Sequence, residues 1–516
     1  MEGVQAVWTP LTKTWLIVGI ALMVALFGLD SSTIPSYSNY ALSEFQSNSL
    51  QGTLGVTLSG ISAVMKIPVA KFSDILGRGE VFTFSIVMFY LGFILHCAAS
   101  SFGTFAAGTV FYAFGQASNI VLLNILVSDL TSMRIRALVL NLVFSPVLVP
   151  TWVAGPIVNS VVDGVGWRWG YGMFAIMMPI GGAVLIVALL HLQKKAKKKG
   201  LIIAKKSSIV QFCSEVDLGG LLLVSTGLTL FLIPVSLARR TAHRWDTRWI
   251  STSLAIGTLL MLCIWPYEQF AARQPCIRIQ YFKTRAIILP AIMALFDMAD
   301  FGATHTYLFP WSATSHNLSA RDTVYLVSIN SVAQCVSGSI AGAFMYKFRR
   351  YKLIAFLGAC TRLLGYGVMV RLRNNGSSIA ELFAVQIVQG LGSGMIEAIF
   401  IVAAQIVVPH AELAQVTAFV SMAFNLGAAI GAAIAGSIYT SHPKERLRIR
   451  LRSEENDTLV EHMFESISEP SQWGSPERSA VALAYSDVMG YITIAALALS
   501  IPVVLAAWFF PNDELG

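Results

Sequence analysis

Residues 14–36 read TWLIVGIALMVALFGLDSSTIPS, and this stretch decides the class of fold. It contains one charged side chain, Asp30, and is long enough for a helix to cross the roughly 30 Å of hydrocarbon in a bilayer. Comparable runs recur along the 516-residue chain, in which 55% of the residues are hydrophobic and 12% are charged. The sequence therefore predicts an all-α integral membrane protein, because helices satisfy their own backbone hydrogen bonds in lipid.

The composition also excludes several other classes of protein. The chain is too apolar for a disordered protein or a soluble nucleic-acid binder, despite its net charge of +8. Its six cysteines are scattered without the spacing of metal ligands, so we expect no disulfide scaffold, no metal site and no cofactor. No catalytic constellation is found either, and we expect no enzyme.

Fourteen apolar runs predict fourteen membrane-spanning helices. The predicted spans are 14–36, 50–70, 81–100, 104–128, 136–160, 170–191, 216–237, 249–270, 286–311, 323–346, 351–371, 379–406, 414–440 and 486–510. The longest intervals between them are polar, and they leave no room for a soluble domain.

The distribution of lysine and arginine predicts the orientation. These residues concentrate in the N-terminus and in the loops after the even-numbered spans, which the positive-inside rule places in the cytoplasm together with both termini. The densest cluster, within 194–199, also suits a contact with anionic lipids. All three N-x-Ser/Thr sequons fall in loops predicted to lie outside. These candidate glycosylation sites, which indicate a eukaryotic secretory-pathway membrane, are Asn317, Asn375 and Asn456.

Two parts of the chain resemble each other. The first and ninth spans both carry an aspartate seven residues before a tyrosine, Asp30 with Tyr37 and Asp300 with Tyr307. We therefore expect two six-helix bundles, a plan that many transporters use to hold a substrate between the halves. The predicted parts are residues 1–191, the basic cytoplasmic loop and two extra helices at 192–285, and residues 286–510 with a long outer loop at 441–485. That outer loop is interpreted as a lid over the outer mouth, or as an ordinary solvated loop.

The loop after the second span, residues 70–80, reads AKFSDILGRGE. Asp74 and Arg78 lie four residues apart, with Gly77 available for a tight turn. This pattern predicts a conformational latch that clamps helix ends together, and the alternative is a basic loop that only fixes topology.

Ionisable side chains inside a membrane are costly and usually face a cavity or a partner. Helical spacing places Asp297, Asp300 and Thr304 on one face of their span, and places Gln386, Ser393 and Glu397 on one face of another. Arg362 needs a carboxylate, and Glu397 on the next span is the nearest candidate along the sequence. Burial favours the uncharged form of a carboxyl group, so the pattern predicts proton-linked transport. The candidates for proton coupling and translocation are Asp30, Asp297, Asp300, His305, Arg362 and Glu397.

Each of these candidates also has an alternative interpretation. Asp30, Asp297 and His305 lie toward the outer ends of their spans, where water can hydrate them. Arg362 and Glu397 can form a fixed structural pair.

Several short motifs resemble the fungal siderophore–iron transporter family, a fourteen-span branch of the major facilitator superfamily. The more specific ones are WRWGYGMF at 167–174 and GSPER at 474–478. The others are GVQ at 3–5, LDSST at 29–33 with Tyr40 and Ala41, SDLTS at 128–132 with Arg136, RYK at 350–352 and GAAIG at 427–431. The 70–80 loop is similar to the superfamily's G-x-x-x-D-R-x-G-R-R/K signature at Asp74, Gly77 and Arg78.

The resemblance implies proton-coupled uptake of ferric siderophores by alternating access, in a monomer of the plasma membrane or of an endosomal or vacuolar membrane. A metal that is already wrapped by its chelator needs aromatic walls and hydrogen-bond donors rather than protein ligands. The substrate-cavity candidates are Tyr37, Thr304, Tyr307, Trp311, Gln386, Ser393 and Tyr439. The aromatic members also suit an interfacial belt.

A proton-coupled exporter or exchanger of glutathione, drugs or fungal toxins is the alternative function. Fourteen-span exporters often carry G-P-x-x-G-G in the fifth span, whereas this chain has only Gly155 and Pro156. The fourth span also lacks the arginine usual in proton-coupled exporters. Both differences favour import.

The predicted orientation has a direct test. We expect epitope tags at the two termini to be accessible to antibody only after the cytoplasmic face is exposed, because an even number of spans returns the chain to its starting side. Antibody binding in intact and permeabilised cells measures this. Tags on opposite faces would contradict the pairing of two equal halves.

Overall fold

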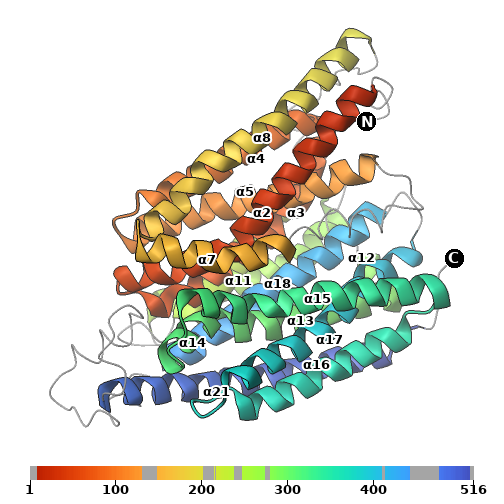
Figure 1. Ribbon diagram of the computed structural model, residues 1–516. Helices are drawn as coiled ribbons and strands as arrows, with labels where there is room; N and C mark the ends of the chain where they lie inside the picture. The colour runs from red at the N-terminus through yellow and green to blue at the C-terminus, as the bar shows by residue number, and fades with distance from the viewer. Residues whose placement is uncertain are drawn as a thin grey trace.

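The computed structural model describes residues 9–130, 148–200, 214, 217–237, 247–272, 279–408, 413–441 and 476–511. Every regular element within these residues is a helix. The predicted all-α class is therefore confirmed (Figure 1).

The first six long helices share one hydrophobic core. They are α2 (Pro10–Glu44), α3 (Gln51–Ile75), α4 (Arg78–Cys97), α5 (Phe102–Leu130), α7 (Leu148–Asp163) and α8 (Trp167–Lys198), and a short 3₁₀ helix, η1 (Asn48–Leu50), precedes α3. Aromatic rings fill the centre of this core, where Phe89 stacks on Tyr112 with ring centroids 5.1 Å apart. We refer to this group as the N-half.

Seven later helices form a second group, the C-half, with cores of its own. They are α13 (Arg285–Thr306), α14 (Leu308–Ser315), α15 (Ala320–Phe348), α16 (Lys352–Leu372), α17 (Ile379–Ile406), α18 (Leu413–Ser441) and α21 (Pro476–Trp508). The predicted span 286–311 lies within Arg285–Ser315, which is one candidate membrane span, and its helix is interrupted at Tyr307. Pro310 lacks the N–H that would bond to the carbonyl of Thr306, so a continuous helix is disfavoured there.

Between the halves in sequence the structure describes three helices: α10 (Leu218–Leu237), α11 (Arg248–Phe270) and the short α12 (Ile279–Lys283). Helix α10 packs on both α3 and α18, so it contacts the N-half and the C-half at once. Its buried leucines, among them Leu221 and Leu228, contact a cluster that includes Val56 of α3 and Ala432 of α18. The extra pair therefore covers one side of the junction between the halves.

Twelve helices in the described part of the chain are long and apolar enough to cross a membrane. Helix α3 covers the predicted span 50–70, and α7 overlaps the described part of the predicted span 136–160, from residue 148 onward. Neither helix is among those twelve. A multi-pass membrane protein is thereby established, and the count of fourteen crossings stays a prediction.

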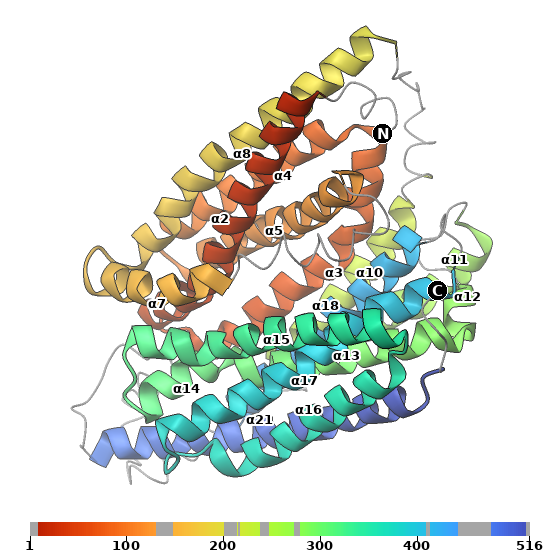
Figure 2. The same ribbon diagram turned by 45° about the vertical axis from the view of Figure 1, so that its right-hand side comes forward.

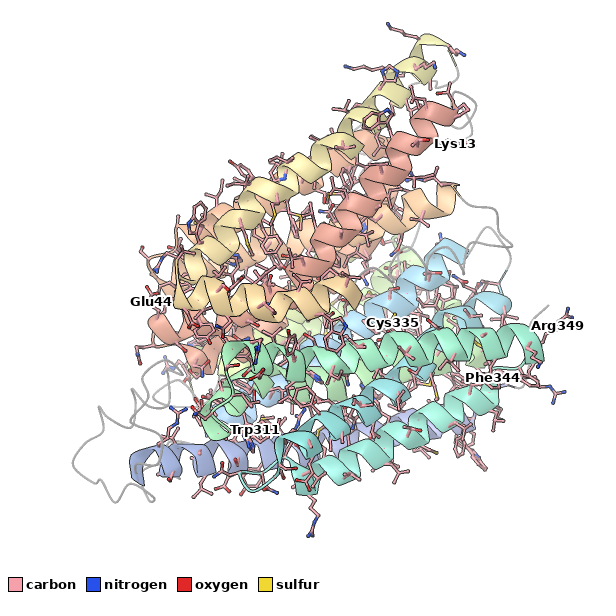
Figure 3. The ribbon with its side chains drawn as sticks, viewed as in Figure 1. Lys13, Glu44, Trp311, Cys335, Phe344 and Arg349 are labelled. Carbon is pink, nitrogen blue, oxygen red and sulfur yellow. The ribbon has the colours of Figure 1, made fainter. Side chains whose placement is uncertain are left out.

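The two halves are close together at one end of the molecule and diverge toward the other. Glu44 and Trp311 lie at the closed end, whereas Lys13 and Arg349 lie at the end where the halves diverge (Figure 3). Both termini are at the diverging end, and a second view shows the same divergence of α8 and α2 from the C-half (Figure 2).

The predicted latch lies at the turn between α3 and α4. Gly77 has a φ of 120°, which an L side chain rarely adopts, and a Cβ there would lie 1.9 Å from the Nε2 atom of Gln193 in α8. The Arg78 side chain is buried and donates to the Ser73 hydroxyl. Lys197 Nζ lies 3.6 Å from Glu80 Oε1, so charge also links this turn to the end of α8. The Asp74 side chain lies outside what the structure describes.

Gly77 provides a test of this packing. We expect Gly77→Ala to lower the free energy of unfolding by about 1–3 kcal/mol, because the new methyl group adds backbone strain and a clash with Gln193. Gly490→Ala is the matched control, since a Cβ at Gly490 meets nothing within 4 Å. Thermal unfolding in detergent measures both variants. Equal melting temperatures would show that the turn tolerates a side chain.

Candidate functional site

A fully buried arginine is at the centre of the C-half. Arg362 of α16 extends to α13, where its Nε lies 2.8 Å from Asp297 Oδ1 and its Nη2 lies 2.7 Å from Asp300 Oδ1. None of the three side chains is exposed. Such a charge is tolerated inside a membrane only with partners of this kind, so the three residues form one unit, the Arg362 cluster.

Neutral groups complete the Arg362 cluster. The Tyr366 hydroxyl, one turn along α16, donates to Asp300 Oδ1 at 2.7 Å. The Ser393 hydroxyl of α17 donates to Asp297 Oδ2 at 3.4 Å, and Arg362 Nη2 also donates to the Asp297 carbonyl at 2.8 Å. Three helices thus fix the positions of the charged atoms.

The prediction that Glu397 is the carboxylate partner of Arg362 was wrong. The ion pairs of the arginine are with Asp297 and Asp300, whereas Glu397 is half-buried and forms no ion pair with Arg362. The arginine side chain is long enough to pass α17 and reach α13. Proximity along the sequence therefore misled the prediction, although Glu397 is close enough to act electrostatically on Arg362.

The charge balance of the Arg362 cluster favours protonation of one of its carboxyl groups. Two carboxyl groups share one guanidinium, so full ionisation would leave an excess negative charge in a fully buried site. An uncompensated charge in such a place is costly, and one proton on a carboxyl group removes it. Asp300 Oδ2 has no hydrogen-bond partner among the described residues, so this atom is open to a proton.

A second polar group lies nearer the closed end, at the end of α13. Arg373 Nη1 donates to the Thr304 carbonyl at 2.8 Å, and its Nη2 donates to Gln386 Oε1 at 3.4 Å. Gln386 Nε2 lies 3.3 Å from His305 Nε2. The candidates Thr304, His305 and Gln386 therefore do come together, around an arginine that the sequence reading missed.

A signal for Arg373 was present in the sequence. It follows the predicted span 351–371 by two residues, in the predicted loop before the next span. However, Arg362, Tyr366 and Arg373 are spaced by four and seven residues, which places them on one face of a continued helix. Only 3% of Arg373 is exposed, so that face is buried to its end.

Asp30 lies in the N-half, apart from the Arg362 cluster. Its side chain is fully buried and accepts a hydrogen bond from the Tyr112 hydroxyl at 2.9 Å through Oδ2, and Gln116 donates in turn to that hydroxyl. Asp30 Oδ1 has no partner in the described part of the chain. Tyr37, seven residues on, packs against Tyr171 in the core of the N-half rather than facing the C-half.

The other aromatic candidates are buried near the closed end. Tyr307 and Tyr439 stack with ring centroids 4.0 Å apart, and Trp311 Nε1 donates to the Ser486 hydroxyl at 3.1 Å. All three side chains are buried, so in this conformation they fill the protein interior instead of lining an open cavity.

Two of the three sequons lie within the described residues. Asn317 is exposed in the turn between α14 and α15, and Asn375 is exposed in the turn between α16 and α17. Asn456 and most of the long loop at 441–485 lie outside the described residues. No group of three or more potential metal-ligating side chains occurs in the described ranges.

Comparisons with known proteins identify the family. The model of the Major Facilitator Superfamily matches residues 20–296 and 290–444, and the chain belongs to this superfamily. The siderophore iron transporter mirC of Emericella nidulans is 28% identical over 528 residues, covering 100% of this chain and 87% of its own length. The low affinity heme transporter str3 of Schizosaccharomyces pombe is 30% identical, over 96% of this chain and 82% of its own.

Solved structures agree on the fold. A bacterial homolog of the human lysosomal transporter Spinster superposes with a TM-score of 0.62 at 13% identity, over 99% of this chain and 100% of its own. A POT peptide transporter superposes with a TM-score of 0.60 at 14% identity, over 96% and 93%.

Stability measurements can test the Arg362 cluster. We expect Arg362→Gln to lower the free energy of unfolding by about 3–5 kcal/mol, because it leaves buried carboxyl groups without a cation. Asp300→Asn should cost less than half as much, since the ion pair with Asp297 remains. The control is Arg371→Gln, an exposed arginine of the same helix, with a change within about 0.5 kcal/mol. Thermal unfolding in detergent reports all three, and wild-type stability of Arg362→Gln would contradict the ion pairing.

Proposed function

We propose that the protein takes up ferric siderophores together with protons, by alternating access between its two halves. The observation that supports this substrate is the near full-length similarity to siderophore iron transporters, such as mirC and the ARN1 protein of Saccharomyces cerevisiae. The wrapped iron of such a chelate is substrate and needs no protein ligand. This agrees with the substrate-cavity candidates, whose side chains offer hydroxyls, amides and aromatic rings.

Proton coupling is supported by the Arg362 cluster. A carboxyl group of Asp297 or Asp300 would take a proton when the outer end is open, which balances the charge of the cluster. Losing that proton toward the cytoplasm would restore the excess negative charge. Half-buried Glu397, on the same helix as Ser393, is the proposed relay between the cluster and water. Asp30 is a separate candidate in the N-half.

Alternating access follows from the arrangement of the halves. The closed end carries Glu44 and Trp311, and we assign it to the outside (Figure 3). The diverging end, with both termini, would face the cytoplasm, and residues 1–191 and 286–510 would move as two bundles. In the same proposal the protein is a monomer of the plasma membrane or of an endosomal or vacuolar membrane, with Asn317 and Asn375 as glycosylation sites.

Heme is a second candidate substrate. The relative that is 30% identical is named a low affinity heme transporter, and heme, although planar, is another large iron chelate. Aromatic side chains such as Tyr307 and Tyr439 suit either ligand. Competition between the two ligands for one transporter distinguishes them.

Uptake into proteoliposomes tests the proposed function. We expect radiolabelled ferric trihydroxamate to accumulate faster at an external pH of about 5.5 than at about 7.5, because external protons load the carboxyl groups. Excess hemin tests the second candidate by competition. The proposal would be contradicted if the proton gradient drove export of preloaded chelate, or if no iron chelate were transported at all.

Carboxyl variants separate coupling from binding. We expect the double variant Asp300→Asn with Glu397→Gln to exchange chelate across the membrane but to lose accumulation driven by a pH gradient. In this variant Asp297 alone balances the charge of Arg362, so the excess negative charge that would bind a proton is gone, and the proposed relay is gone as well. Asp322→Asn, an exposed aspartate at the start of α15, is the control and should behave as wild type. Proton-driven accumulation by the double variant would rule out this coupling site.

A further inference from the structure

Lys66 of α3 is a positive charge at membrane depth. It is half-buried, and no hydrogen bond or ion pair joins it to another residue that the structure describes. Nine residues separate it from Ile75 at the end of α3, a distance of about 14 Å along the helix axis, which the four-carbon stem of a lysine cannot span. Lys66 therefore cannot reach the membrane surface along its own helix, and a charge at such depth usually faces a passage or a ligand.

The two halves touch each other at the closed end. Asn48 of η1 donates to the Tyr485 hydroxyl at 3.4 Å, and the Gly52 amide donates to the Tyr307 hydroxyl at 3.2 Å. A Cβ at Gly52 would lie 2.7 Å from the Cα of Gly436 in α18, so the backbones of α3 and α18 are in contact there. A bulky chelate cannot pass this junction while it is closed.

Lys66 lies on the face of α3 that forms this junction. A Cβ at Gly55 would lie 3.0 Å from the Cβ of Ala432 in α18, so Gly55 faces α18. Lys66 follows Gly55 by eleven residues, which is close to three full turns, so the two residues lie within about 20° of each other around the helix. Helix α3 starts beside Glu44 at the closed end and runs toward the end where the halves diverge (Figure 3). Lys66 therefore lies beyond the junction, on the side of α3 that faces the C-half.

Helix α18 carries a polar side chain on the facing side. Asn425 precedes Gly436 by eleven residues, so it lies on the face of α18 that meets α3. Counted from the glycine contact at the junction, Asn425 lies about 16 Å along α18 and Lys66 about 21 Å along α3. Asn425 is half-buried, and its Nδ2 donates to the Ser421 carbonyl of its own helix at 2.7 Å. A cation and an amide are thus placed on facing sides where α3 and α18 leave the closed junction.

The carboxyl groups proposed for proton coupling do not neutralise Lys66. No ion pair or electrostatic interaction joins Lys66 to any of them, that is, to Asp30, Asp297, Asp300 or Glu397. A cation without a counter-ion is costly at this depth, and a negatively charged ligand lowers that cost.

We propose that Lys66 binds a carboxylate of the transported chelate, so that the protein favours negatively charged ferric chelates over neutral ones. An ammonium group is a compact charge with several donors, so it holds a carboxylate without fixing the orientation of the bulky chelate. Hydroxamate chelates with a free carboxyl group belong to this class, and so does heme with its propionates. The proposal rests on the proposed function, whose failure the following experiments separate from its own.

Equilibrium binding to the purified full-length protein provides the test. The probes are two forms of one radiolabelled linear ferric trihydroxamate, whose terminal amine is either acetylated or succinylated, so that the chelate is neutral or negatively charged around the same iron centre. We expect the wild type to bind the succinylated form on the order of tenfold more tightly. Lys66→Gln should bind both forms as the wild type binds the neutral one, and Lys66→Arg should keep the preference because it keeps the charge.

The control is Lys283→Gln, which removes a positive charge from an exposed position of α12 and should leave the preference unchanged. A purely structural lysine would, when replaced, weaken the binding of both chelates equally. If Lys66→Gln kept the preference, or if the wild type had none, the assignment of Lys66 would be overturned while the proposed function stands. If neither chelate bound to the wild type, both would be overturned.

Thiol accessibility provides a second measurement, which does not depend on the charge of the chelate. With the native cysteines replaced, Lys66→Cys in lipid nanodiscs should react with a membrane-impermeant methanethiosulfonate reagent, and saturating neutral ferric trihydroxamate should slow this reaction severalfold. Val87→Cys, at an exposed apolar position of α4, is the control and should not react, because it faces lipid. An unreactive cysteine at position 66 would show that this position does not face the passage, and would overturn the proposal even if the Gln variant failed to fold.

Discussion

A guanidinium in the middle of a membrane bundle has to be matched by negative charge, and the C-half is organised around this constraint. Arg362 brings α16 toward α13, and Asp297 and Asp300 are placed one turn apart to receive it. Tyr366 and Ser393 then fix the carboxylates from α16 and α17. Two acids for one base would leave the cluster one negative charge in excess if both were ionised, and this imbalance is the physical basis of the proposed proton coupling.

The N-half has a different character. Its polar centre is Asp30 with Tyr112 and Gln116, and it has no arginine comparable to Arg362 in the described residues. Its aromatic core is continuous from α2 to α8. The two halves therefore share an architecture while their charges differ, and the C-half holds the stronger candidate for proton coupling. At the closed end they meet through tyrosine, asparagine and backbone groups, which separate at lower cost than buried ion pairs.

Much of the fold was predictable, because the bilayer imposes a simple rule on the chain. Apolar runs of sufficient length must become helices, and these runs correspond to the observed helices from α2 to α21. The interruption at Tyr307 was not predicted, because a proline alone does not mark such a site in this chain: Pro35 and Pro290 lie within uninterrupted helices. The candidate site was predicted in part: helical spacing placed Asp297 and Asp300 on one face, but the partner of Arg362 and the buried position of Arg373 were missed.

The sequence by itself determined the class of protein, the approximate spans and the residue types available for chemistry, because these depend on hydrophobicity and on periodicity along one helix. Only the tertiary structure decided which charges pair and which surfaces meet. Arg362 contacts Asp300 across 62 positions of sequence, and Asn48 contacts Tyr485 across 437. Such contacts depend on how separate helices pack in three dimensions, and no local pattern in the sequence specifies which distant residues come together.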